Sequence, residues 1–164
     1  IFREFAERNQ DIMVKEAYID AFTMWLVRNP EDLDVVVLPN MFGDIATDLA
    51  SVLQGGMGMS ASANMGPKHM LFEPVHGSSP KHAGKNVVNP IAMIQSVQMM
   101  FEALAFRKKD QNLDTCAEIL QSAIQKHFEE GGIVTYDLGG TASTSEVGQA
   151  IALRCESMLK ERFP

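Results

Sequence analysis

The sequence DVVVLPNMFGDIATD, residues 34–48, decides the expected fold because it joins a strand pattern to a helix pattern. The run at 34–38 is short and β-branched and is followed by Pro39, which is typical of a buried strand. The residues after Gly43 have the apolar spacing of an amphipathic helix. The apolar stripe of that helix is formed by Leu49, Val52 and Leu53.

Asp44 and Asp48 lie four residues apart in this expected helix. Side chains at this spacing share one helical face, so the two carboxylates should point the same way, one turn apart. Like charges so placed repel each other by a few tenths of a kcal/mol. A hard divalent cation such as Mg²⁺ or Mn²⁺ would suit such a pair. The alternative is that Asp44 favours a helix N-terminus and Asp48 is simply solvated.

The bulk composition is that of a globular protein with its own core. The chain has 164 residues, of which 46% are hydrophobic and 21% charged. Its net charge of −7 shows no basic footprint for nucleic acid, and no run approaches the length of a membrane span. Cys116 and Cys155 lie far apart and are expected to be reduced thiols, which favours a cytoplasmic or similarly reducing compartment.

The remaining elements follow from periodicity and breakers. The first part alternates helices with strands, whereas the chain after residue 90 is mostly helical. Strands are expected at 13–18, 34–38 and 70–72. Helices are expected at 1–9, 22–27, 43–54, 91–106, 113–129 and 144–161. Gly131 and Gly132 should end the helix that begins at 113, and Thr144 should cap the last one.

Several motifs occur in an order and spacing that resemble one enzyme family. They are YID (18–20), NMFGD (40–44) with Asp48, EPVHGSSP (73–80), AGK (83–85), VNP (88–90) and DLGGTAST (137–144). Together they resemble the isocitrate and 3-isopropylmalate dehydrogenases, which are metal-dependent decarboxylating β-hydroxyacid dehydrogenases. The similarity runs from about residue 15 to the C-terminus.

The resemblance implies an α/β fold of which this chain looks like the C-terminal half, with strands alternating with helices up to residue 90. Residues 1–54 would belong to the smaller, dimer-forming domain with the metal carboxylates, and residues 55–164 to the large cofactor-binding domain. The family's catalytic lysine and tyrosine and its substrate-clamping arginines would lie upstream. Because those residues are upstream, the resemblance implies that this chain is inactive alone. The chain starts at Ile1 without a Met, in what looks like the middle of a helix, which is typical of a fragment.

The resemblance assigns Asp20, Asp44 and Asp48 to a site for Mg²⁺ or Mn²⁺ beside the substrate. Asp44 and Asp48 would act within one chain, and Asp20 would come from the neighbouring subunit of a homodimer or larger oligomer. Asp20 and Asp44 are the candidate catalytic residues. Without the resemblance, Asp20 would be interpreted as the N-cap of a helix beginning at Ala21.

The loop after residue 73 is the candidate cofactor site. Gly77, Ser78 and Ser79 would let backbone N–H groups approach the phosphates of a dinucleotide. By resemblance, His76 lies against the adenosine side of the cofactor and Asn89 contacts adenine.

The choice between NADP and NAD depends on Lys81. NAD-preferring members carry an aspartate at this position, whereas a lysine attracts the 2′-phosphate of NADP. NADP-dependent isocitrate dehydrogenases resemble this chain at Lys81, His82 and Tyr136, although Gly140 stands where they have an arginine. We therefore expect NADP, with NAD as the alternative; Lys81 as a solvated loop lysine is the plainer interpretation.

The resemblance implies oxidative decarboxylation of a 2-hydroxy-3-carboxy acid of the isocitrate or 3-isopropylmalate type. The motifs conflict over which acid this is. A tartrate- or malate-type substrate is an alternative, and so is a non-catalytic regulatory subunit of a hetero-oligomeric dehydrogenase. Cytoplasmic location is expected, with the mitochondrial matrix left open.

Overall fold

The computed structural model describes residues 2–163 and is mostly helical, with one small sheet of two strands. It consists of two compact units that divide between Ala50 and Ser51. The expected domain boundary after residue 54 stays a prediction. No helix among residues 2–163 is both long and apolar enough to cross a membrane.

The first unit is built from helices and extended segments. Its helices are α1 (Phe2–Arg8), α2 (Ile19–Arg28) and most of α3 (Asn40–Leu53), whose last residues lie past the division after Ala50. A short 3-10 turn η1 (Pro30–Asp32) lies between α2 and α3. Buried Phe22 and Leu26 of α2 and Ala46 of α3 form its core. Leu33, Leu38 and Leu49 pack around these three, so α2 and α3 pack against each other. Of the expected apolar stripe of α3, only Leu49 joins this core, because Val52 and Leu53 are 68% and 47% exposed.

The strands expected at 13–18 and 34–38 are wrong for this structure. Neither segment is a strand, and Val35, Val36 and Val37 are 83%, 43% and 65% exposed. A strand requires a neighbour that accepts and donates its backbone hydrogen bonds. Among residues 2–163 only β1 and β2 pair with each other, so the valine run has the composition of a buried strand without a partner.

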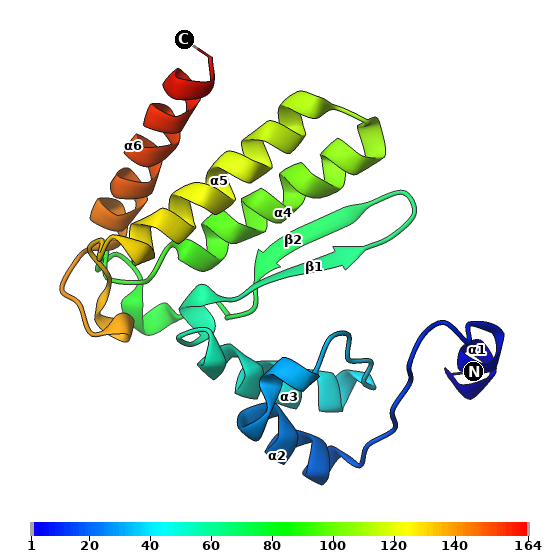
Figure 1. Ribbon diagram of the computed structural model, residues 1–164. Coiled ribbons are helices and arrows are strands. Elements are labelled where there is room, and N and C mark those ends of the chain that lie inside the picture. Colours follow the sequence, from blue (N-terminus) through cyan, green and yellow to red (C-terminus); the bar gives the residue numbers. More distant parts are fainter. Residues whose placement is uncertain (1, 164) are drawn as a thin grey trace. The chain divides into compact units, whose positions relative to one another are not determined.

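The second unit packs three long helices beside a β-hairpin. Strands β1 (Ala61–Met65) and β2 (Met70–Pro74) pair antiparallel, with Ala63 opposite Phe72. The helices are α4 (Ile91–Lys108), α5 (Gln111–Glu129) and α6 (Thr144–Arg162), and α4 lies between the hairpin and α5 (Figure 1). Short 3-10 turns connect these elements at η2 (Met57–Met59), η3 (Pro80–His82) and η4 (Tyr136–Leu138).

The core of the second unit joins all three long helices. It contains Ile91 of α4, Ala123 and Ile124 of α5, and Val147 and Ile151 of α6, each at most 7% exposed. Burying a valine or isoleucine side chain contributes about 1.5–3 kcal/mol, and the methyl group of Ala123 contributes less. This core therefore fixes the helix ends from which the connecting loops arise.

The N-termini of α5 and α6 are capped by side chains. The Asp110 carboxylate accepts hydrogen bonds from the backbone N–H groups of Asn112 and Leu113 at the start of α5. At α6, Ser143 and Glu146 form a reciprocal capping box. The cap expected at Thr144 is thus one residue earlier, because a partner three residues onward exists only for Ser143.

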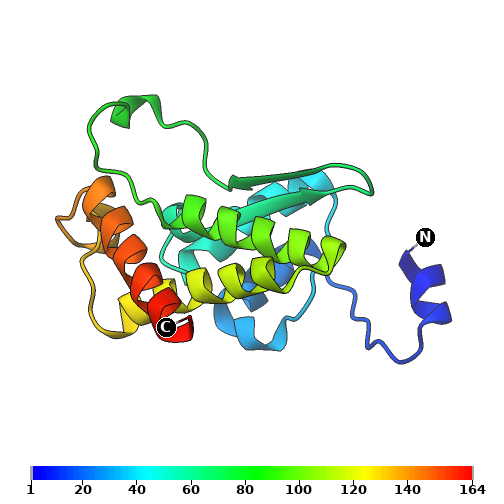
Figure 2. The ribbon, with the colours of Figure 1, turned by 90° about the horizontal axis from the view of Figure 1, so that it is seen from above.

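The long helices were otherwise predicted to within a few residues, and the expected helix at 1–9 is observed from residue 2, residue 1 being outside the described part. The strand expected at 70–72 extends to Pro74, and its partner β1 was missed. Alternation of small and polar residues in β1 is a weak strand signal. Figure 2 shows the connection from β2, which arches outward and returns to the start of α4.

Candidate functional site

Asp44 and Asp48 are both exposed on α3, one helical turn apart. Asn40 Nδ2 donates a 3.2 Å hydrogen bond to Asp44 Oδ2. No lysine or arginine occurs in α3, so the helix itself supplies no compensating charge. Exposed carboxylate oxygens on one face are suitable donors for a hard divalent cation, and the pair fits the predicted role.

Asp20 lies in the first turn of α2 and is exposed. Its Oδ1 accepts a 2.8 Å bond from the N–H of Ala21, but the N-cap of α2 is Tyr18, so the N-cap interpretation of Asp20 is wrong. The helix begins earlier than expected because the N–H of Phe22 already bonds to the carbonyl of Tyr18. Within residues 2–163 no three acidic, histidine or cysteine side chains gather as metal ligands. A contribution of Asp20 from a neighbouring subunit stays a prediction.

The first half of the candidate cofactor loop, residues 76–79, leaves its backbone accessible. His76, half-buried two residues after the end of β2, donates from Nδ1 to the carbonyl of Gly77 at 2.9 Å. A Cβ placed on Gly77 would meet nothing within 4 Å, and Ser78 and Ser79 are exposed. Ser79 adopts a left-handed conformation with φ of 45°, which is uncommon for a residue other than glycine. The backbone here has room for a phosphate to approach.

Two rings from distant parts of the sequence meet beside this loop. His82 and Tyr136 stack with ring centroids 5.9 Å apart and planes inclined by 28°. The hydroxyl of Tyr136 lies 3.4 Å from His82 Nε2, and Ser79 Oγ lies 2.7 Å from His82 Nδ1. Both rings line a cavity of about 320 Å³ together with Val87, Thr141 and Ala142. The exposed Lys81 belongs to the same short turn, η3, as His82.

The Tyr136 turn is attached to the start of α4 through polar side chains. Thr135 Oγ1 donates to one carboxylate oxygen of Asp137, and Asn89 Nδ2 donates to the other at 3.1 Å. Asn89 Oδ1 in turn accepts from the N–H of Ile91 at 3.0 Å. Asn89 is only 7% exposed, so its amide is committed to these internal bonds. The structure therefore joins Asn89 to the turn that contains Tyr136, through Asp137. Contact between Asn89 and adenine stays a prediction.

The loop is also attached to α6. Asn86 Oδ1 accepts from the N–H of Ser145 at 3.1 Å, and Asn86 Nδ2 donates to Ser145 Oγ at 2.7 Å. The N–H of Thr144 bonds to the carbonyl of Asn86 at 3.0 Å. Sequence reasoning missed the positioning roles of Asn86 and Asp137. Each carries a weak local signal: an asparagine tolerates the positive φ of 55° at position 86, and a T-x-D spacing permits the Thr135–Asp137 bond.

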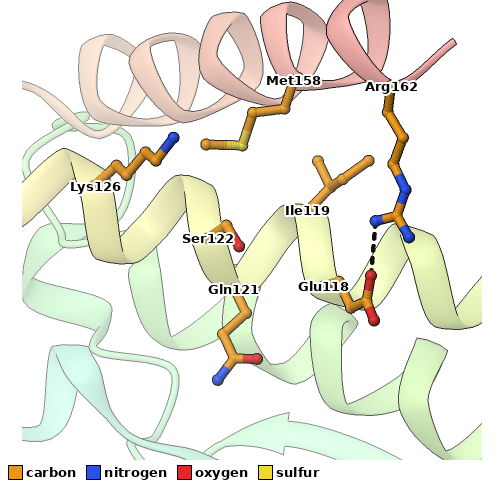
Figure 3. Close-up of a pocket in the computed structure, with 7 residues that line it drawn as sticks. All are labelled: Glu118, Ile119, Gln121, Ser122, Lys126, Met158 and Arg162. Atoms are coloured by element: carbon orange, nitrogen blue, oxygen red, sulfur yellow. Dashed lines mark hydrogen bonds and ion pairs between the residues drawn. The ribbon is translucent and has the colours of Figure 1, made fainter.

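A second cavity, of about 360 Å³, lies between α5 and α6 (Figure 3). Ile119 of α5 and Met158 of α6 line it together with polar residues such as Gln121 and Ser122. Arg162 is held by a 2.6 Å ion pair with Glu118 at one end. None of the predicted site residues lines this cavity.

A family model matches most of this chain. The model is that of isocitrate/isopropylmalate dehydrogenase, and it matches residues 1–151. The chain therefore belongs to the isocitrate/isopropylmalate dehydrogenase family, a family of NAD(P)-dependent decarboxylating oxidoreductases.

Individual relatives agree with this assignment. The chain is 41% identical over 155 residues to the 3-isopropylmalate dehydrogenase of Methanothermobacter thermautotrophicus, covering 94% of this chain and 45% of the relative. It is 43% identical over 150 residues to the mitochondrial isocitrate dehydrogenase [NAD] catalytic subunit 5 of Arabidopsis thaliana, covering 91% of this chain and 38% of the relative.

The solved structure of isocitrate dehydrogenase from Methylococcus capsulatus matches with a TM-score of 0.85 and 38% identity, over 93% of this chain and 44% of the other. The chain thus resembles part of that fold and spans less than half the length of these relatives.

Proposed function

We propose that this chain forms the metal-carboxylate and cofactor-binding part of a dehydrogenase that oxidatively decarboxylates a 2-hydroxy-3-carboxy acid of the isocitrate or 3-isopropylmalate type. The observation that carries the proposal is the meeting of His82 and Tyr136 at a cavity beside Lys81. The acidic face of α3 with Asp44 and Asp48, together with family membership, supports the metal-dependent chemistry. We expect a homodimer or larger oligomer in the cytoplasm.

Asp44 and Asp48 would hold Mg²⁺ or Mn²⁺, with Asp20 of a neighbouring subunit completing the ligand set. When bound, such a cation supplies Lewis acidity to the oxygens of the hydroxy acid. The chain's own contribution is to place two carboxylates on one face of α3, one turn apart. Asn40 supports this arrangement by donating a hydrogen bond to Asp44, which restricts the rotation of that carboxylate.

The loop and the Tyr136 turn would bind the adenosine end of NADP. Exposed Lys81 provides positive charge for the 2′-phosphate, and His82 and Tyr136 provide hydrogen-bonding groups on one side of the cavity. Backbone N–H groups at Gly77 and Ser78 would approach the pyrophosphate from the open side of the loop. NAD is the alternative cofactor.

The test is reduction of NADP⁺ and NAD⁺ by the intact protein with Mg²⁺, offered isocitrate, 3-isopropylmalate and tartrate separately. Turnover of one acid supports the proposal and names the substrate. A folded, metal-loaded oligomer that is inactive with all three acids would contradict it and favour a regulatory subunit.

The cofactor assignment is tested with Lys81→Asp. This change should shift the ratio of kcat/KM for NADP⁺ to that for NAD⁺ toward NAD⁺ by about tenfold or more, because a lost charge-assisted contact is worth about 1.5–3 kcal/mol. Lys68→Asp, an exposed lysine in the turn of the β-hairpin, is the matched control and should leave the ratio unchanged. An unchanged ratio in Lys81→Asp would remove Lys81 from the cofactor site.

A further inference from the structure

His127 is a buried polar side chain that lines neither of the two cavities. It lies in the last turn of α5 and is 1% exposed. Its Nε2 is 2.8 Å from the carbonyl oxygen of Ile133, and a carbonyl only accepts, so Nε2 carries the hydrogen and donates. Its Nδ1 is buried without a hydrogen-bond partner in the described part of the chain. The ring thus makes one directed bond, to the segment that leaves the helix.

The backbone around this ring closes tightly. The N–H of Gly132 donates to the carbonyl of His127 at 2.7 Å, and the N–H of Gly131 donates to the carbonyl of Phe128 at 3.1 Å. With φ of +68° at Gly131, these two bonds form a Schellman motif. A Cβ on Gly132 would lie 2.5 Å from ring atoms of His127, so glycine is required there. The helix end and the imidazole therefore determine where the chain enters the next segment.

That segment leads directly to the turn that contains Tyr136. The two ends of this turn are joined by hydrogen bonds from the N–H of Ala142 to the carbonyl of Val134 and from the N–H of Gly140 to the carbonyl of Thr135, both 3.0 Å. Asn89 and Asp137 hold the far side of the turn, whereas the near side is held by the His127 bond to Ile133. Tyr136 is presented between these two attachments.

We propose that His127 is a positioning residue that sets the placement of the Tyr136 turn, and hence the recognition of a 2′-phosphate at the His82–Tyr136 cavity. The consequence for ligand recognition rests on the proposed function. An apolar side chain of similar size would fill the space of the imidazole but leave the Ile133 carbonyl without its donor. A longer amide could replace the donor, since the Nε2 of glutamine can reach the position of the imidazole Nε2.

The experiment compares His127→Leu and His127→Gln in the intact protein, with Ile119→Val as a control for loss of packing. Ile119 is buried on the same helix but lines the α5–α6 cavity of Figure 3, and contributes no side-chain hydrogen bond. Two readouts are taken: amide hydrogen exchange of residues 133–138, and dissociation constants for adenosine 2′,5′-bisphosphate and adenosine 5′-monophosphate. His127→Met is the second apolar variant if His127→Leu does not fold.

The apolar variant should speed exchange in residues 133–138 and weaken binding of the bisphosphate about fivefold, the factor that corresponds to one lost hydrogen bond. Binding of the monophosphate should change less than twofold, and His127→Gln should restore both readouts. Equal weakening of both nucleotides, failure of His127→Gln to restore, or the same pattern in Ile119→Val would overturn the positioning role.

The two proposals fail in different ways. If the unmodified protein binds the bisphosphate no better than the monophosphate, the NADP assignment fails. Hydrogen exchange then still decides the positioning role: faster exchange in the apolar variant supports it, and unchanged exchange overturns it.

Discussion

Replacing Asn89 by alanine should destabilise the second unit, because this buried amide connects three segments. It donates to Asp137 Oδ2 at 3.1 Å and to Met59 Sδ at 3.5 Å, and it accepts from the N–H of Ile91 at 3.0 Å. Gly58 packs so closely that a Cβ there would lie 2.9 Å from the Asn89 Cβ. Alanine would remove all three bonds and leave the N–H of Ile91 at the start of α4 without its acceptor.

The magnitude follows from these contacts. Loss of the bond to Ile91 resembles loss of a helix cap, about 1 kcal/mol, and loss of the bond to a carboxylate costs about 1.5–3 kcal/mol. Asp137 is exposed and keeps Thr135 as a donor, so water replaces part of the second loss. We therefore expect the free energy of unfolding to fall by about 2 kcal/mol, which corresponds to about 4–8 °C in Tm for a chain of this size.

Urea denaturation at 25 °C, followed by circular dichroism, measures this change. Asn64→Ala is the matched control, because Asn64 is exposed and makes one weak 3.4 Å bond to Glu73. It should change the free energy of unfolding by less than about 0.5 kcal/mol. If Asn89→Ala had the same free energy of unfolding as Asn64→Ala, the hydrogen bonds of Asn89 at the Tyr136 turn would not stabilise the fold as argued.

Three further predictions concern the same loops and the metal face. Gly140→Ala should lower Tm by several degrees, because its Cβ would collide with the carbonyl oxygen of Val134. Gly148→Ala in α6, where a Cβ meets nothing within 4 Å, should not lower Tm, and a Gly140→Ala melt equal to that of the unmodified protein would contradict the prediction. Hydrogen bonds from the Ser143 side chain and backbone lower the pKa of Glu146. The carboxylate therefore stabilises the fold fully above the ordinary glutamate pKa, and this contribution is lost as pH falls through the lowered pKa. Glu146→Gln should reduce the loss of unfolding free energy at acid pH, measured by urea titration, and an unchanged loss would refute the prediction. Mg²⁺ at about 100 times its Kd should stabilise the intact oligomer by about 2.7 kcal/mol in thermal melts, and Asp44→Asn should abolish most of this gain; equal gains in both proteins would remove Asp44 from the metal site.

Local patterns determined much of the helical structure. The apolar spacing at 91–106 predicted α4, whereas the expected ends of α5 and α6 came from Gly131-Gly132 and from the cap near Thr144. Signals of this kind are local and do not depend on the neighbour against which the helix packs. The two aspartates of α3 were placed on one face for the same reason. Strands depend on a partner that is remote in sequence, and the valine run 35–37, which resembles a buried strand, is exposed and unpaired here.

The sequence by itself therefore determined the helices, the family and the shared face of Asp44 and Asp48, since each depends on residues close together or on motif order. Only the tertiary structure decided that His82 stacks on Tyr136, 54 positions later, and that Asn89 reaches Asp137 across 48. It also decided that His127 is buried and donates to Ile133. Contacts of this kind depend on how the helix ends and loops meet around a common core, and no local periodicity records that.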